Sequence, residues 1–175
     1  MIAAVSSDPF RGPDPFREHE TAYRALKVYA FDPLRGRRGG NHLVLRVPYE
    51  VLQPGPVGTR VAVVDEDLDG KRLHSPVDLD HPFIPRNGGL EPSDSNPHFH
   101  QQMVYAVISH VLRTFDRALG RQMRFHAVGT GAVSRLTVRP HAMGVANACY
   151  DPTTVALSFG QFNAVGNSGG RYIPG

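Results

Sequence analysis

The chain has 175 residues, a formal net charge of +3 and a single cysteine. This length suffices for one domain with its own hydrophobic core, and the lone Cys149 excludes both an intramolecular disulfide and a cysteine-based zinc cluster. The basic run at residues 35–38 has no aromatic platform or basic helix beside it, so we expect no binding to nucleic acid. No apolar stretch has the length of a membrane span, and no signal peptide is evident, which makes the cytoplasm the default location.

The first 20 residues are interrupted by proline and glycine and predict a flexible arm, followed by one domain over residues 21–175. In this domain three runs rich in branched residues, each bounded by Gly, Pro or Asp, predict strands at 25–31, 43–47 and 59–64. Residues 65–70, Asp-Glu-Asp-Leu-Asp-Gly, resemble the opening of an EF-hand calcium loop. Pro76 stands where that loop needs a bidentate glutamate, so the stronger interpretation is a β-turn leading to a strand around Arg72.

The segment 76–95 is rich in proline and contains Asn-Gly-Gly, which predicts a long surface connection without a catalytic role. The strongest local signal follows it and predicts a helix over residues 97–119. Asn96 is suited to cap the helix, Pro97 to occupy its first position and Gly120 to end it. Apolar residues spaced by three and four predict one stripe that packs on a sheet: Met103, Val104, Val107, Ile108, Val111, Leu112 and Phe115.

Four further strands are predicted after the helix, at 123–128, 135–138, 144–150 and 155–159, and a turn at 151–154 joins the last two. The run of short strands around one long helix predicts the α+β class. We expect a twisted, mostly antiparallel sheet with the helix packed across it.

Nine histidines raise the question of a metal site. His98 and His100 are two residues apart and point to different sides of the predicted helix, while His110 lies beyond chelating distance of both. His126 and His141 belong to separate segments, and nothing in their spacing requires them to meet. Ordinary hydrogen-bonded histidines are the favoured interpretation, and we assign no metal ligand.

Motifs of hydrolytic enzymes are also missing from the sequence. The only His-Glu pair, at 19–20, lacks the second histidine of a His-Glu-x-x-His zinc helix. No Gly-x-Ser-x-Gly elbow surrounds the serines that we considered: Ser134, Ser158 and Ser168. Cys149 has the chemistry of a nucleophile if it pairs with His141 or His126, but a lone cysteine in an apolar strand is more often a small buried hydrophobe. We therefore expect no catalytic residue in this chain.

Residues 147–160, Asn-Ala-Cys-Tyr-Asp-Pro-Thr-Thr-Val-Ala-Leu-Ser-Phe-Gly, resemble the hairpin that precedes the zinc helix in thermolysin-like zinc metallopeptidases. The helix opening at 97–105 resembles the same family, and Pro-Val-Asp-Leu-Asp at 76–80 is similar to a group of its bacterial relatives. The resemblance covers the chain from about residue 61 onward. It implies an incomplete thermolysin-like N-terminal domain that stops before the zinc helix.

In that family an extended peptide substrate lies as an added strand beside the edge of this hairpin. The resemblance implies that the Asn147 side chain and the Ala148 carbonyl bind the substrate backbone, and that Tyr150 walls a subsite; the alternative is a plain sheet edge. Zinc, with calcium as a further candidate, would belong to a full-length relative, and the missing C-terminal catalytic half would be a partner. Two other functions stay open: a non-catalytic module that binds peptides on this edge, and a truncated product without function.

Overall fold

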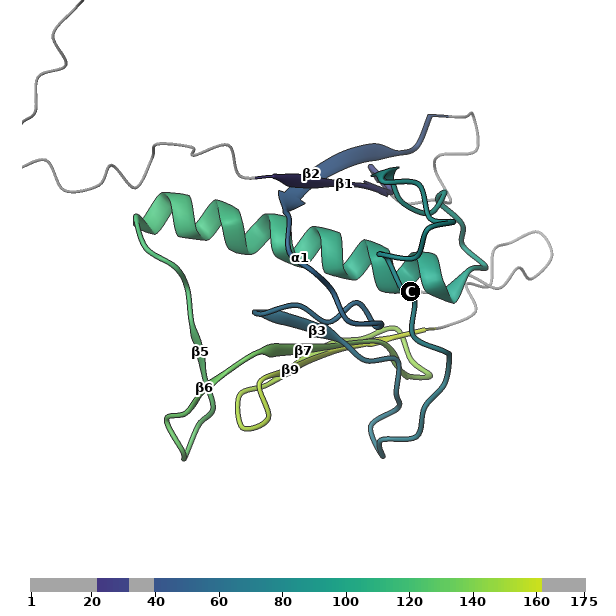
Figure 1. The fold of residues 1–175 in the computed structure, drawn as a ribbon. Helices are drawn as coiled ribbons and strands as arrows, with labels where there is room; N and C mark the ends of the chain where they lie inside the picture. Colours follow the sequence, from purple (N-terminus) through teal and green to yellow (C-terminus); the bar gives the residue numbers. More distant parts are fainter. Residues whose placement is uncertain (1–21, 32–39, 162–175) are drawn as a thin grey trace, which may run out of the picture.

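The computed structural model describes residues 22–31 and 40–161, so the predicted arm at 1–20 and the basic run at 35–38 lie outside the described residues. One long helix, α1 (Pro97–Leu119), accompanies short strands in this part of the chain (Figure 1). In chain order the strands are β1 (Tyr23–Val28), β2 (Leu43–Pro48), β3 (Val61–Val63), β4 (Asn87–Gly88), β5 (Phe125–His126), β6 (Val133–Ser134), β7 (Leu136–Met143), β8 (Ala148–Asp151) and β9 (Ala156–Gly160).

The strands form mixed sheets, so the fold is α+β as predicted but the expectation of a mostly antiparallel sheet is wrong. The larger sheet has the order β3-β7-β9-β8, in which β3, β7 and β9 are parallel and only β8 is antiparallel to its neighbour. The three-stranded sheet, β2-β1-β4, pairs β1 antiparallel with β2 and parallel with β4, and β5 and β6 form a separate two-stranded antiparallel sheet. The reason for the parallel pairing of β3 with β7 is that the chain crosses over through α1 between them.

Helix α1 lies between the two sheets, with β1 and β2 on one side and β3, β7 and β9 on the other (Figure 1). Two adjacent buried glutamines show this arrangement. The Nε2 of Gln102 donates to the carbonyl of Lys27 in β1 at 3.0 Å, whereas the Nε2 of Gln101 donates to Asp65, just after β3, at 3.0 Å. Because neighbouring residues in a helix point about 100° apart, one glutamine hydrogen-bonds the β1 side of α1 and the other hydrogen-bonds the β3 side.

The helix bounds and both of its caps are confirmed. The Oδ1 of Asn96 accepts the N–H of His98 at 3.0 Å, and Gly120 ends the helix with a φ of 65°. The predicted apolar stripe is only partly right, because its members Val107, Val111 and Phe115 are 36%, 43% and 51% exposed. The stripe members Met103, Val104, Ile108 and Leu112 do pack in the core, and the fully buried residues of α1 are Phe99, Gln101, Gln102, Tyr105, Ala106 and Leu112.

Several predicted strands are shorter than expected. The strand expected around Arg72 is reduced to one isolated bridge with Glu66, and the turn that precedes it is confirmed. The prediction at 123–128 shrinks to the two residues of β5, because this hairpin pairs over only two positions. The turn at 151–154 is confirmed by the pairing of Asp151 with Ala156. The described residues contain no helix that is both long and apolar enough to cross a membrane.

Candidate functional site

Strand β8 forms one edge of the larger sheet and contains two of the predicted substrate-binding residues, Ala148 and Tyr150, while the third, Asn147, directly precedes it. Its four residues, Ala148–Asp151, are all exposed, and among the described strands it pairs with β9 alone. The hairpin is held at its start by Gly160, whose N–H donates to the carbonyl of Asn147 at 2.8 Å. Gly160 is needed here because a Cβ at this position would lie 1.8 Å from the carbonyl oxygen of Val145.

The register of the hairpin decides which backbone groups of β8 face outward. Asn147 lies opposite Gly160 and is hydrogen-bonded to it, and the next pair is Ala148 with Phe159. Antiparallel ladders alternate hydrogen-bonded and non-hydrogen-bonded pairs. Ala148 and Tyr150 therefore turn their N–H and C=O groups away from β9, toward the free edge.

The side chains at this edge fit the same picture. The Oδ1 of Asn147 accepts the outward N–H of Ala148 at 2.9 Å, which places this amide beside the free edge. Tyr150 is 49% exposed and lies next to the edge. Cys149 is exposed, so the interpretation as a buried hydrophobe is wrong: within residues 22–31 and 40–161, nothing buries any of the four residues of β8.

A second group of polar side chains is buried between the larger sheet and α1. Asp65 follows β3, His74 lies in the loop after it, and His141 belongs to β7. The side chains of Asp65 and His141 are 1% and 2% exposed, while that of His74 is 35% exposed. His100 and Gln101, from the first turns of α1, complete the group that we call the Asp65 cluster.

The Asp65 carboxylate is the centre of this cluster. The Nδ1 of His141 lies 2.9 Å from its Oδ1 and 3.0 Å from its Oδ2. The Nδ1 of His74 and the Nε2 of Gln101 each lie 3.0 Å from the same Oδ2. Burial alone would raise the pKa of Asp65, but the hydrogen bonds from His141 and Gln101, together with the histidine charges, lower it on balance.

His141 and His100 form a direct imidazole pair. The Nε2 of His141 lies 2.9 Å from the Nδ1 of His100, whose own Nε2 lies 3.1 Å from the carbonyl oxygen of Ser93. Burial lowers the pKa of His100 to about 4, and the charge of His141 acts in the same direction. His100 is therefore a neutral imidazole at pH 7, with its proton on Nε2 because the Ser93 carbonyl can only accept.

Three comparisons, with family models, with curated proteins and with solved structures, find no match for the chain.

Sequence reasoning found the residues of the β8 edge but missed the Asp65 cluster. The structure does not bring His126 to His141: the ring of His126 hydrogen-bonds the carbonyl of Gly131 in its own hairpin at 3.0 Å. His98 and His100 do point to different partners, since His98 contacts Ser75 at 2.9 Å. A usable signal was present in residues 65–74, where an acidic residue and a histidine stand nine positions apart around a predicted turn.

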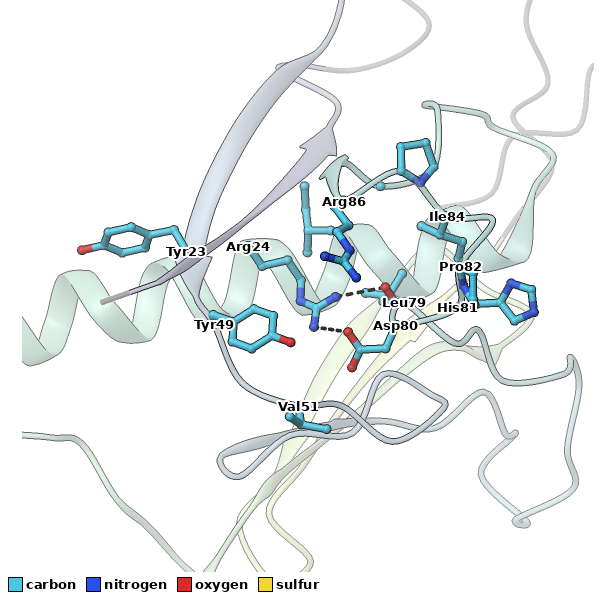
Figure 2. A pocket seen from close by; sticks show the side chains of 13 residues that line it. Tyr23, Arg24, Tyr49, Val51, Leu79, Asp80, His81, Pro82, Ile84 and Arg86 are labelled. Carbon is cyan, nitrogen blue, oxygen red and sulfur yellow. Dashed lines mark hydrogen bonds and ion pairs between the residues drawn. The ribbon is translucent and has the colours of Figure 1, made fainter. Parts of the chain in front are cut away.

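A hollow of about 630 Å³ is lined by residues of β1, by Tyr49 and by the loop around Ile84 (Figure 2). Arg24 lines this hollow. It is only 8% exposed, and its guanidinium donates to the carboxylate of Asp80 and to the carbonyl of Leu79. Asp80 is the last residue of the Pro-Val-Asp-Leu-Asp segment. This acidic residue thus forms an ion pair that fastens the long connection to β1.

Proposed function

We propose that this chain is the substrate-aligning part of a thermolysin-like zinc endopeptidase, and that an extended peptide adds to β8 as a further strand. The observation that carries the proposal is the free edge of β8, whose residues are all exposed and whose partner β9 occupies one side only. An edge strand with unpaired backbone groups is the usual template for β-strand addition. The resemblance of residues 147–160 to the family hairpin supports the assignment to peptidases.

The backbone and one side chain of the edge supply the contacts. Ala148 offers its outward carbonyl and Tyr150 its outward N–H and C=O, while the outward N–H of Ala148 is already bonded to the Asn147 side chain. Because the Oδ1 of Asn147 is already an acceptor for Ala148, its Nδ2 is the atom that donates to a peptide carbonyl. Tyr150 then covers one side chain of the peptide with its exposed ring.

Cleavage requires residues that these 175 do not include. A thermolysin-like enzyme activates a zinc-bound water with the glutamate of a His-Glu-x-x-His helix, and that motif is absent from the sequence. We therefore expect the chain by itself to bind peptides without hydrolysing them.

The rival function is a peptide-binding module that never acts with a catalytic half. Mass spectrometry of the protein from its native source separates the two: a product that carries a His-Glu-x-x-His peptide supports the peptidase, and one near 19.2 kDa supports the module.

Peptide binding is tested by titrating the ¹⁵N-labelled chain with short peptides from a casein digest and following the amide signals by NMR. We expect shifts concentrated at Ala148 and Tyr150, whose N–H groups face the free edge. Asn147→Ala should weaken the best peptide about 2- to 10-fold, as expected for one hydrogen bond. Cys149→Ser is the matched control, because the backbone of Cys149 pairs with β9. Shifts confined to other surfaces, or equal affinities of the Asn147→Ala and wild-type chains, would overturn the proposal.

A further inference from the structure

The Asp65 cluster brings two imidazoles and a carboxylate together in a buried place. One ligand atom from each of Asp65, His74 and His141 lies within 4.8 Å of the others. Two histidines with one carboxylate are a ligand set that zinc takes in proteins, with a fourth position left for water. We propose that these three residues bind one zinc ion. The proposal uses no residue of β8, so it is independent of the peptide-binding function.

The spacing of the ligand atoms is close to that of a loaded site. Zinc bonds to imidazole nitrogen and carboxylate oxygen are about 2.0–2.2 Å long, which places neighbouring ligands of a tetrahedral ion roughly 3.3–3.5 Å apart. In the structure the Nδ1 atoms of His74 and His141 both lie 3.0 Å from the Oδ2 of Asp65. The ligand atoms of all three residues lie within 4.8 Å of one another, so local side-chain movements bring them to an ion between them.

The surroundings hold the carboxylate ligand in place. Gln101 donates through Nε2 to the Oδ2 of Asp65, and its amide cannot turn over because its Oε1 accepts the N–H of Val77 at 2.8 Å. The same Nε2 also donates to the carbonyl of Ser75 at 3.1 Å. Hydrogen bonds of this kind to a ligand are a regular part of protein zinc sites.

The hydrogen bonds between the two imidazoles are compatible with a zinc ion on His141. The row of hydrogen bonds runs from the Ser93 carbonyl through His100 and His141 to the Asp65 carboxylate, and both of its end groups can only accept. Without a metal, this row needs three ring protons on the two imidazoles. With zinc on the Nδ1 of His141, two protons suffice: one on the Nε2 of His141, donated to His100, and one on the Nε2 of His100, donated to Ser93. Zinc would thus replace the contact between His141 Nδ1 and Asp65 and keep the other two hydrogen bonds with both rings neutral, the form in which imidazole binds metals.

The partly exposed side chain of His74 gives the ion access from solvent. Its side chain is 35% exposed, whereas those of Asp65 and His141 are buried, so the fourth coordination position lies on the His74 side and is filled by water. The ion would tie the loop after β3 to β7. Hard cations are a poor match, because calcium and magnesium prefer oxygen ligands and most of this set is nitrogen.

The test is a titration of the full chain, freed of metal with a chelator, with zinc chloride in a calorimeter and with cobalt chloride in a spectrophotometer. We expect one zinc per chain with a dissociation constant in the micromolar range or below, the strong visible absorption of four-coordinate cobalt, and a higher melting temperature with zinc. Calcium and magnesium at millimolar concentration should not compete. Failure to bind one zinc per chain would overturn the proposal.

Variants connect the binding to these residues. His74→Ala removes the half-exposed ligand and should leave the fold intact, as circular dichroism of the metal-free protein will show, while weakening zinc binding at least 100-fold. His100→Ala acts through His141 and should weaken zinc binding about 10- to 100-fold. His110→Ala is the matched control, since His110 is an exposed histidine of the same helix outside the cluster. Zinc affinity that survives His74→Ala, or that falls equally in His110→Ala, would refute the site.

Discussion

Replacement of Asp80 tests whether the long connection 76–95 depends on one ion pair. The guanidinium of Arg24 has three acceptors: the Asp80 Oδ1 at 2.6 Å, the carbonyl of Leu79 at 3.0 Å and the carbonyl of Glu50 at 3.1 Å. The other oxygen of Asp80 accepts the N–H of Leu52 at 2.9 Å. Asp80→Ala therefore leaves a buried cation without its counter-ion and a backbone donor without its acceptor.

The expected cost follows from the exposure of the two partners. Breaking a fully buried ion pair by removing one partner costs about 3–5 kcal/mol. Here Arg24 is 8% exposed but the Asp80 side chain is 32% exposed to the water of the hollow, which screens part of the interaction. We expect Asp80→Ala to lower the free energy of unfolding by about 2 kcal/mol. Asp80→Asn keeps an acceptor for Leu52 and should cost about half as much.

The pH dependence supplies a second readout of the same pair. Burial would raise the pKa of Asp80, but the Leu52 hydrogen bond and the Arg24 and Arg86 charges lower it on balance. A carboxyl whose pKa is lower in the folded state stabilises the protein above its unfolded pKa of about 3.9 and loses that contribution as the pH falls through the folded value. Asp80→Asn should thus flatten the loss of stability below about pH 5.

Urea unfolding followed by circular dichroism at pH 7, for the first effect, and over a series from about pH 5 down to about pH 2, for the second, measures both. The control is Asp78→Ala, because the Oδ1 of Asp78 accepts only the N–H of Asp80, at 3.0 Å, on an exposed turn. If Asp80→Ala and Asp78→Ala lose the same free energy at pH 7, the ion pair with Arg24 does not fasten the connection and the reasoning fails.

Two further substitutions test the hairpin and the helix cap. Gly160→Ala would place a Cβ 1.8 Å from the carbonyl oxygen of Val145, so we expect a loss of at least about 2 kcal/mol in urea unfolding. Gly144→Ala, with no atom within 4 Å of its Cβ, should cost far less, and equal losses would contradict the close approach. Asn96→Ala removes the acceptor for the N–H of His98 and should cost about 1 kcal/mol in thermal unfolding, whereas Asn96→Ser should restore most of it. Equal melting of these two variants would show that the cap contributes nothing.

Helix α1 was predictable because its signals are local. The cap at Asn96, the proline at position 97 and the glycine at position 120 act within one turn of the helix ends, so no distant residue is needed to interpret them. Which face of the helix is buried was not predictable in the same way. Val107 and Phe115 are apolar and fall on the expected stripe, but burial is set by where the sheets lie, and these two side chains are left 36% and 51% exposed.

The β8 edge was recognisable as a strand and hairpin, while its freedom on the outer side depends on strand order. A strand with the sequence of residues 148–151 would have the same local signal in the centre of a sheet. Only the arrangement β3-β7-β9-β8, in which the chain leaves β7, passes to the outside and returns through β9, makes β8 the edge. Sequence patterns of period two report the faces of a strand and not its neighbours.

The Asp65 cluster depends on strand direction in the same way. Val63 at the end of β3 lies opposite Val138 of β7 in parallel register, and the N–H of Val64 donates to the carbonyl of Val138 at 2.9 Å. Two residues further along both strands, Asp65 is level with position 140, and His141 is its neighbour there. Antiparallel pairing, as first expected, would have carried Asp65 toward the beginning of β7 and away from His141. The parallel crossover through α1 therefore does two things at once: it brings the carboxylate to the β7 histidine, and it lays the first turns of the helix, with His100 and Gln101, over the pair.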